Sequence, residues 1–270
     1  MKRILVVGCI ERCNNEVVVD ALRSRGFDVD YTEKVKVPDV LKLRSFDVVY
    51  GVHLQTCSRY VMTAEMLGRK TIIHFVGSDA YRYARERGLR KLFWRSVIGR
   101  CDQVLYVSPH LMKLVGRQGS VLPLPIRIDL FKKSREDTTV PKRDVLYFCP
   151  GGSEGAKTYR RDWIVDYARS HPEEKITIIG NSISPADRDF NMPNVEVVPY
   201  VPYDRMGEVY ARHRKLIRMT TQDGLPRMVS EALLSGLEVI FNGRNVTDVP
   251  SERDPEVFAQ RFEEELLRIL

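Results

Sequence analysis

One stretch near the C-terminal end, residues 215–241, constrains the fold more than any other. It predicts a strand at 215–220, a Gly-containing turn, a helix at 227–235 and a second strand at 237–241. Met228, Ala232 and Leu233 share one face of that helix. Pro226 and Gly236 lie where helices commonly begin and end. A strand that continues through a helix into another strand is one unit of a parallel sheet, so the stretch predicts an α/β fold.

The same alternation runs along the rest of the chain. Further strands are predicted at residues 2–8, 27–31, 47–50, 70–75, 102–107, 144–149, 175–180 and 195–198, and helices at 16–25, 109–115, 203–213 and 255–270. The charged segment 132–143 contains few apolar residues and predicts a linker. We therefore expect two Rossmann-like domains, 1–131 and 144–270, each with a parallel sheet covered on both faces.

Composition limits the cellular compartment and the class of protein that this chain can belong to. The chain has 270 residues, a net charge of +7 and 43% hydrophobic residues, which is enough for two cores. It contains no apolar run of 18 residues, and the apolar start is too short for a signal peptide. Five scattered cysteines fit reduced thiols rather than a disulfide framework. We expect a cytoplasmic protein that can also lie peripherally on the inner face of the membrane. We expect no metal site.

Two turns in the second half carry the candidate ligand chemistry. Gly151 and Gly152 follow strand 144–149 and would let a backbone approach a diphosphate, with Lys157 as a nearby cation. Gly180 ends the next strand. A flexible loop with a surface lysine is the alternative interpretation of this turn.

The second turn is the one between the strands at 215–220 and 237–241. The amides of Arg227, Met228 and Val229 would lie at a helix start and form an anion site, with the carboxylates of Asp223 and Glu231 on either side. Carboxylates accept hydrogen bonds from sugar hydroxyls, so the arrangement suits a sugar joined to a nucleoside diphosphate. An ordinary crossover with two solvated carboxylates remains the alternative.

The first half offers two candidates at strand ends. Gly8 opens a loop where nucleotide-binding folds meet phosphate. The full Gly-x-Gly-x-x-Gly pattern is absent, so an NAD-type cofactor is not expected, and the role of residues 11–14 stays open. His74 ends an apolar strand and is followed by Gly77 and Asp79, at the edge where α/β sheets bind ligands. A buried structural histidine is the alternative.

The second turn resembles the acidic-x7-Glu motif of retaining GT-B glycosyltransferases, family 4 in particular. The matching positions are Gly224, Glu231, Ala232, Gly236, Val239 and Ile240, while Asp223 and Glu238 replace the usual Glu and Pro. The His74–Gly77 segment is similar to the His-Gly-x-Asp/Glu turn of that family, with two additional residues. The resemblance covers most of the chain and implies a compact GT-B fold, with two Rossmann-like sheets facing across a cleft and an N-terminal domain on the acceptor side.

The resemblance also implies an activity: metal-independent, retaining transfer of a hexose from a UDP- or GDP-linked sugar, with no further cofactor. Asp223 and His74 would orient the donor sugar, Glu231 would bind the ribose, and Lys157 would stabilise the diphosphate. The base would rest near Gly180.

Two departures from the family pattern concern the rest of the chain. The family's diphosphate-binding Arg is replaced by Gly151 or Gly152, with Arg160 or Arg161 as candidate substitutes. The chain also stops before the family's usual return to the first domain.

The segment 80–100 concentrates positive charge. It holds seven basic residues against Glu86 alone, interleaved with aromatic residues. We predict that Arg85, Arg90, Lys91 and Arg95 contact a membrane surface or an anionic acceptor, a lipid-linked one being a candidate. A solvated helix face is the alternative. Nucleic-acid binding through this segment is a weaker alternative, because no sequence motif of a known nucleic-acid-binding domain accompanies it.

Two other functions of the whole chain remain open. A sugar-nucleotide epimerase on the same fold would need no acceptor. A catalytically weak recruiting subunit would explain the departures from the family pattern.

Overall fold

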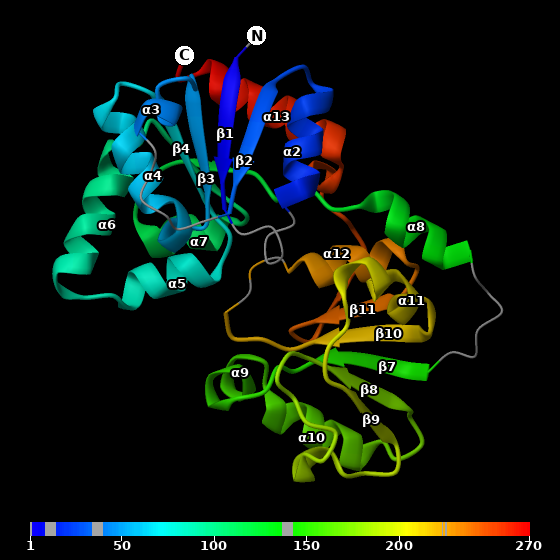
Figure 1. The fold of residues 1–270 in the computed structure, drawn as a ribbon. Helices are drawn as coiled ribbons and strands as arrows, with labels where there is room; N and C mark the ends of the chain where they lie inside the picture. Colours follow the sequence, from blue (N-terminus) through cyan, green and yellow to red (C-terminus); the bar gives the residue numbers. More distant parts are fainter. Residues whose placement is uncertain (1, 9–14, 34–39, 137–142, 223, 225) are drawn as a thin grey trace. The chain divides into compact units, whose positions relative to one another are not determined.

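The computed structural model describes residues 2–8, 15–33, 40–136, 143–222, 224 and 226–270 (Figure 1). The chain forms two α/β units. Unit 1 comprises Met1–Ile126 and Pro250–Leu270, and unit 2 comprises Arg127–Val249.

Unit 1 contains a six-stranded sheet in the order β2-β1-β3-β4-β5-β6, and all its strand pairs are parallel. The strands are β1 (Arg3–Val7), β2 (Asp28–Thr32), β3 (Val48–Val52), β4 (Lys70–Phe75), β5 (Gln103–Tyr106) and β6 (Ser120–Val121). The helices are α2 (Asn15–Ser24), α3 (Val40–Leu43), α4 (Leu54–Met66), α5 (Ser78–Arg85), α6 (Gly88–Arg100), α7 (Pro109–Val115), η3 (Ser251–Arg253) and α13 (Pro255–Leu267).

Unit 2 contains a second six-stranded sheet, in the order β12-β11-β10-β7-β8-β9, with β12 antiparallel and the other strands parallel. The strands are β7 (Arg143–Phe148), β8 (Ile176–Ile179), β9 (Val195–Val198), β10 (His213–Arg218), β11 (Glu238–Phe241) and β12 (Arg244–Val246). The helices are α8 (Ile128–Glu136), α9 (Ser153–Thr158), α10 (Arg161–Ser170), η1 (Arg188–Phe190), η2 (Tyr203–Arg205), α11 (Met206–Ala211) and α12 (Arg227–Leu234).

Strands in the middle of the first sheet are apolar because both faces of the sheet are covered: Ile4, Leu5, Val6 and Val7 of β1 are all buried, and so is every residue of β3. In β1, Ile4 and Val6 pack with α2 and α13, while Leu5 and Val7 pack with α4, α6 and α7. In β7, Tyr147 faces α10, while Leu146 faces α8, α11 and α12. Each unit is therefore a three-layer sandwich with its own core, as the alternating pattern predicted.

The predicted domain boundaries differ from the observed units in three places. Residues 127–131, expected in the first domain, belong to unit 2. Residues 132–136, expected in a linker, belong to helix α8, and residues 137–142 lie outside the described residues. The C-terminal helix α13 belongs to unit 1, not to the second domain, and lies beside α2 (Figure 1). Its Phe258 and Phe262 are fully buried in the unit 1 core. The chain therefore does return to its first unit, and the expectation that it stops too early for this was wrong.

Each sheet has one position where the strand order reverses direction. In unit 1, β2 and β3 lie on opposite sides of β1, and in unit 2, β8 and β10 lie on opposite sides of β7. Parallel α/β sheets bind ligands at the carboxyl ends of the strands that flank such a reversal. The topology therefore places candidate sites after β1 and β3 in unit 1 and after β7 and β10 in unit 2.

Candidate functional site

The two predicted ligand turns meet at the strand-order reversal of unit 2. One turn follows β7 and leads into α9, and the other follows the neighbouring parallel strand β10 and leads into α12. The Thr221 amide of the second turn donates a hydrogen bond to the Thr158 carbonyl oxygen at the end of α9, at 2.9 Å. Two turns that lie far apart in the sequence thus form one edge.

The three glycines predicted to approach a ligand have different environments. A Cβ at Gly151 would lie 1.9 Å from the Ser182 carbonyl oxygen, and one at Gly180 would lie 2.4 Å from the Cys149 carbonyl oxygen. Both glycines are needed because the backbones after β7 and β8 pack directly against each other. Gly152, directly before α9, has a φ of +83°, and a Cβ there would meet no heavy atom within 4 Å. Gly152 is therefore the glycine of this group with open space beside it.

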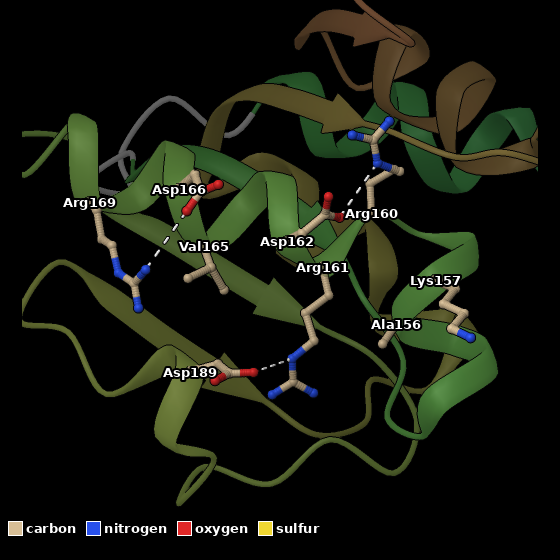
Figure 2. A pocket seen from close by; sticks show the side chains of 9 residues that line it. All are labelled: Ala156, Lys157, Arg160, Arg161, Asp162, Val165, Asp166, Arg169 and Asp189. Atoms are coloured by element: carbon tan, nitrogen blue, oxygen red, sulfur yellow. Dashed lines mark hydrogen bonds and ion pairs between the residues drawn. The ribbon is translucent and has the colours of Figure 1, made fainter.

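A hollow of about 610 Å³ lies beside α9 and α10 (Figure 2). Arg161 is neutralised there, because its Nε lies 2.9 Å from Asp189 Oδ2 and its guanidinium also pairs with Asp187. Lys157 is exposed, and Figure 2 shows its ammonium group turned away from the Arg161–Asp189 pair. Arg160 pairs with Asp162 at 3.4 Å. Arg161 therefore does not offer a spare charge to replace the family's missing arginine.

Arg218 at the end of β10 is a residue that the sequence analysis missed. Its side chain is buried, and its Cζ lies 4.7 Å from the Phe148 ring centroid and 4.4 Å from that of Tyr159. Cation–π contacts of this kind hold a guanidinium by its flat faces. The available signal was a basic residue directly after the apolar pair Leu216–Ile217, near the carboxyl end of a predicted strand. Arg218 places a fixed positive charge between the two turns.

The start of α12 presents fewer amides than predicted. The Val229 amide donates to the Pro226 carbonyl oxygen at 3.1 Å, so it is engaged within the turn. A helix leaves the amides of its first residues without an intrahelical acceptor, and in α12 these belong to Arg227 and Met228. Asp223, predicted to orient the sugar, lies outside the described residues.

Glu231 is buried rather than displayed at the edge. The residue is 2% exposed, and its Oε2 accepts a hydrogen bond from the Tyr210 hydroxyl at 2.9 Å. Burial, together with this neighbouring carboxylate, raises the pKa of Tyr210 and of Tyr203, so both phenols stay protonated. Glu231 Oε1 lies 3.9 Å from Arg227 Nε and has no hydrogen-bond partner within the described ranges. The carboxylate of Glu231 is thus buried among Tyr210, Tyr203 and Arg227.

His74 does not have the environment of the predicted catalytic residue. Its side chain is completely buried, and its Nδ1 lies 2.7 Å from the Tyr50 hydroxyl. Burial lowers the pKa of His74 to about 3, so the ring is neutral. Tyr50 in turn packs on Phe262 of α13, with ring centroids 4.7 Å apart. The structure supports the alternative interpretation, a structural histidine in the core of unit 1.

A different histidine lies at the carboxyl edge of unit 1. His53 follows β3 directly, has a φ of 73°, and places its Nε2 3.4 Å from Ser78 Oγ. Non-glycine residues are uncommon in this left-handed region and often occupy functional positions. Asp79 fixes the adjoining turn, because its carboxylate accepts hydrogen bonds from the amides of Leu54, Val76 and Gly77, all at 3.0 Å.

Gly8, at the end of the neighbouring strand β1, is held by backbone contacts. Its amide donates to the Thr32 carbonyl oxygen at 3.1 Å, and its own carbonyl accepts a hydrogen bond from the Tyr31 hydroxyl at 2.8 Å. Residues 9–14, which include the segment whose role stayed open, lie outside the described residues. Across the described parts of the chain, no group of three or more His, Cys, Asp or Glu side chains is placed to hold a metal ion.

No protein-family model matches the chain, and no curated protein matches it in sequence. Solved structures do match it along nearly its whole length. Sucrose-phosphate synthase from Thermosynechococcus elongatus has a TM-score of 0.63 at 12% identity, covering 99% of this chain and 90% of that one. HepE of Anabaena, in complex with UDP and glucose, has a TM-score of 0.65 at 11% identity, covering 100% and 92%. AviGT4, a glycosyltransferase involved in avilamycin A biosynthesis, has a TM-score of 0.62 at 14% identity, covering 100% and 98%.

Similarity at these identities shows the fold. The predicted fold class, the two-domain Rossmann-like α/β fold of GT-B glycosyltransferases, is confirmed. None of the helices among the described residues is both long and apolar enough to cross a bilayer.

Proposed function

We propose that the protein is a glycosyltransferase that moves a sugar from a nucleotide-diphosphate sugar to an acceptor. The observation that carries the proposal is the meeting of two ligand turns, with Lys157 and Arg218 beside them, at the strand-order reversal of unit 2. Solved structures of the same fold that bind UDP and glucose support the donor class.

In this proposal the diphosphate lies against Gly152 and the amides of Arg227 and Met228. The bond between the anomeric carbon and the diphosphate oxygen breaks, and its electron pair stays on the leaving diphosphate. An acceptor hydroxyl oxygen forms the new bond to the anomeric carbon, and its proton passes to the leaving group or to solvent. Lys157 and Arg218 stabilise the charge that develops on the diphosphate, which lowers the barrier electrostatically. Arg218 thereby takes the part of the arginine that the Gly151–Gly152 turn lacks.

The sugars of the donor would be held by carboxylates. Glu231, whose Oε1 lies beside Arg227, would take a ribose hydroxyl, and Asp223 would orient the transferred sugar. The family resemblance and the composition add further parts to the proposal. They are retention of configuration, a UDP- or GDP-linked hexose as the transferred sugar, independence from metal, a lipid-linked acceptor and a cytoplasmic location.

Nucleotide release tests this function. The full-length chain is incubated with a panel of UDP- and GDP-linked sugars, and the liberated nucleoside diphosphate is measured. We expect release from one donor, and a lower turnover number in Lys157→Ala with little change in donor affinity. Lys175→Ala is the matched control, because Lys175 is also exposed but precedes β8 at the opposite edge of the sheet.

Two results count against the proposal. One is the absence of release from every donor, which favours a recruiting subunit. The other is an epimerised sugar formed without any acceptor, which favours an epimerase.

A further inference from the structure

Helix α6 of unit 1 is apolar on the side that faces away from the core as well as on the side that faces it. Trp94, Val97 and Ile98 are buried on the inner side. On the outer side, Leu89 is 85% exposed and Leu92 is 60% exposed. Two leucines one helical turn apart, both directed to solvent, are not explained by the packing of unit 1.

The outer side of α6 is a narrow stripe with arginines beside it. Leu89, Leu92, Ser96 and Gly99 follow each other at intervals of three and four residues, and all are exposed. On helical geometry, Arg95 and Arg100 flank this stripe on its two sides, and both are exposed. The stripe contains no bulky polar side chain, so it can approach an apolar phase while the arginines remain at its border.

A hollow of about 570 Å³ lies next to this stripe. Its lining includes the three cations Lys91, Arg95 and Arg117, and within the described part of the chain no carboxylate lines it. Arg117 Nη2 donates to the Cys101 carbonyl oxygen at 2.6 Å, which holds its guanidinium at the end of α6. Lys91 Nζ donates to the Tyr83 carbonyl oxygen at 2.5 Å and lies 3.5 Å from the Tyr83 ring centroid. The predicted basic residue Lys91 is thus fixed in the hollow rather than extended into solvent.

The hollow fits an anion, because its cations repel one another in the absence of one. The charge on Arg95 lowers the pKa of Lys91, in addition to the larger effect of desolvation. The one acidic residue of the segment, Glu86, follows α5 and pairs with Arg90, with its Oε2 3.4 Å from Arg90 Nη1. Its charge offsets part of the effect of Arg95 on Lys91, but Glu86 does not line the hollow. A phosphate group bound between Lys91, Arg95 and Arg117 would relieve the repulsion.

We propose that the outer side of α6 docks on an anionic phospholipid membrane. Leu89 and Leu92 enter the boundary between headgroups and acyl chains, and the hollow lined by Lys91, Arg95 and Arg117 receives a lipid phosphate. Charge and apolar surface occur together here, which is the combination that binds a helix in the plane of a membrane. This inference does not depend on the proposed function, because it uses no residue of the unit 2 site.

Vesicle co-flotation of the full-length chain tests the inference. Vesicles of phosphatidylcholine with a fraction of phosphatidylglycerol are compared with vesicles of phosphatidylcholine alone. We expect binding only to the anionic vesicles, weakened by about tenfold or more in the double variant Leu89→Ser/Leu92→Ser and by about tenfold in Arg95→Glu. Circular dichroism and thermal unfolding of each variant confirm that these exposed substitutions leave the fold intact.

Matched controls separate this surface from charge and apolarity in general. Leu267→Ser removes another leucine, 66% exposed, and Arg244→Glu reverses an exposed arginine on β12. Both should bind vesicles like the wild type. The inference is overturned if the chain does not float with anionic vesicles, or if binding survives the double leucine substitution. Equal loss of vesicle binding in the two control variants would overturn it as well. So would displacement of the protein from vesicles by single-stranded DNA, if the leucine substitutions had no effect on vesicle binding.

Discussion

Units 1 and 2 have closely related sheets, yet their carboxyl edges carry different chemistry. In unit 2 the edge is made of glycine turns and a helix start, with Arg218 fixed between two rings. In unit 1 the edge has a strained His53, and the next turn is locked by the buried Asp79. Topology determines where a ligand can bind, whereas the residues after each strand determine which ligand. The backbone-lined edge of unit 2 suits the diphosphate of the proposed donor, whereas the edge of unit 1 is lined by side chains that are held by internal contacts.

The largest expected effect concerns the charge at the edge of unit 2. Arg218→Met keeps an unbranched, buried side chain but removes the positive charge, and we expect turnover to fall about 10²–10³-fold because the leaving diphosphate loses a fixed cation. Arg214→Met, on the exposed amino end of the same strand, is the control and should retain full turnover. Turnover of donor hydrolysis, measured beside thermal stability, checks this. Equal activity of the two variants would remove Arg218 from the site.

The second prediction separates the two glycines of the first turn. Gly151→Ala should reduce the free energy of unfolding by about 3 kcal/mol, because its Cβ would overlap the Ser182 carbonyl oxygen. Gly152→Ala should cost about 1 kcal/mol, since only its positive φ opposes the substitution. Urea unfolding measures both values. Similar losses in the two variants would show that the backbones after β7 and β8 are not in close contact.

The third prediction concerns acid stability of unit 1. Because the pKa of His74 falls to about 3 on folding, the unfolded chain binds a proton there below pH 6.5 and the folded chain does not. The stabilisation is therefore complete above pH 6.5 and is lost as the pH falls toward 3, by about 2 kcal/mol at pH 5. In His74→Asn, the urea midpoint should fall less between pH 7 and pH 5 than in the wild type.

A control for that experiment is available in unit 2. Burial also lowers the pKa of His213, which belongs to unit 2. Replacing His213 should therefore also reduce the loss of stability between pH 7 and pH 5, but through unit 2 rather than unit 1. An unchanged pH dependence in His74→Asn would contradict the burial of His74.

The smallest effect is expected at Glu231. Glu231→Gln keeps the shape of the side chain and an acceptor for the Tyr210 hydroxyl, but weakens the acceptor proposed for the ribose. We expect nucleotide binding to weaken by about 1 kcal/mol, the difference between a charged and a neutral hydrogen-bond acceptor. Isothermal titration with UDP and GDP measures it. A loss of folding rather than of binding would restrict Glu231 to a structural role.

The sequence predicted the strands of both units well, because buried parallel strands form short apolar runs that need no long-range information. It also located both turns of the unit 2 site, since glycines and helix starts are local signals. It could not show that α13 returns to unit 1, because an apolar helix face does not identify the core that covers it. The burial of His74 depends on that same return, through Tyr50 and Phe262. Arg218 was missed because the aromatic rings that hold its guanidinium belong to Phe148 of β7 and to Tyr159 after α9, which are far from it in the sequence.

Binding of a nucleoside diphosphate at the carboxyl edge of unit 2 can be measured by hydrogen–deuterium exchange of the full-length chain, with and without saturating UDP or GDP. We expect slower exchange in peptides that cover residues 150–160 and 219–229, with no comparable change around Gly8 and His53. Protection confined to unit 1, or no protection with either nucleotide, would contradict it.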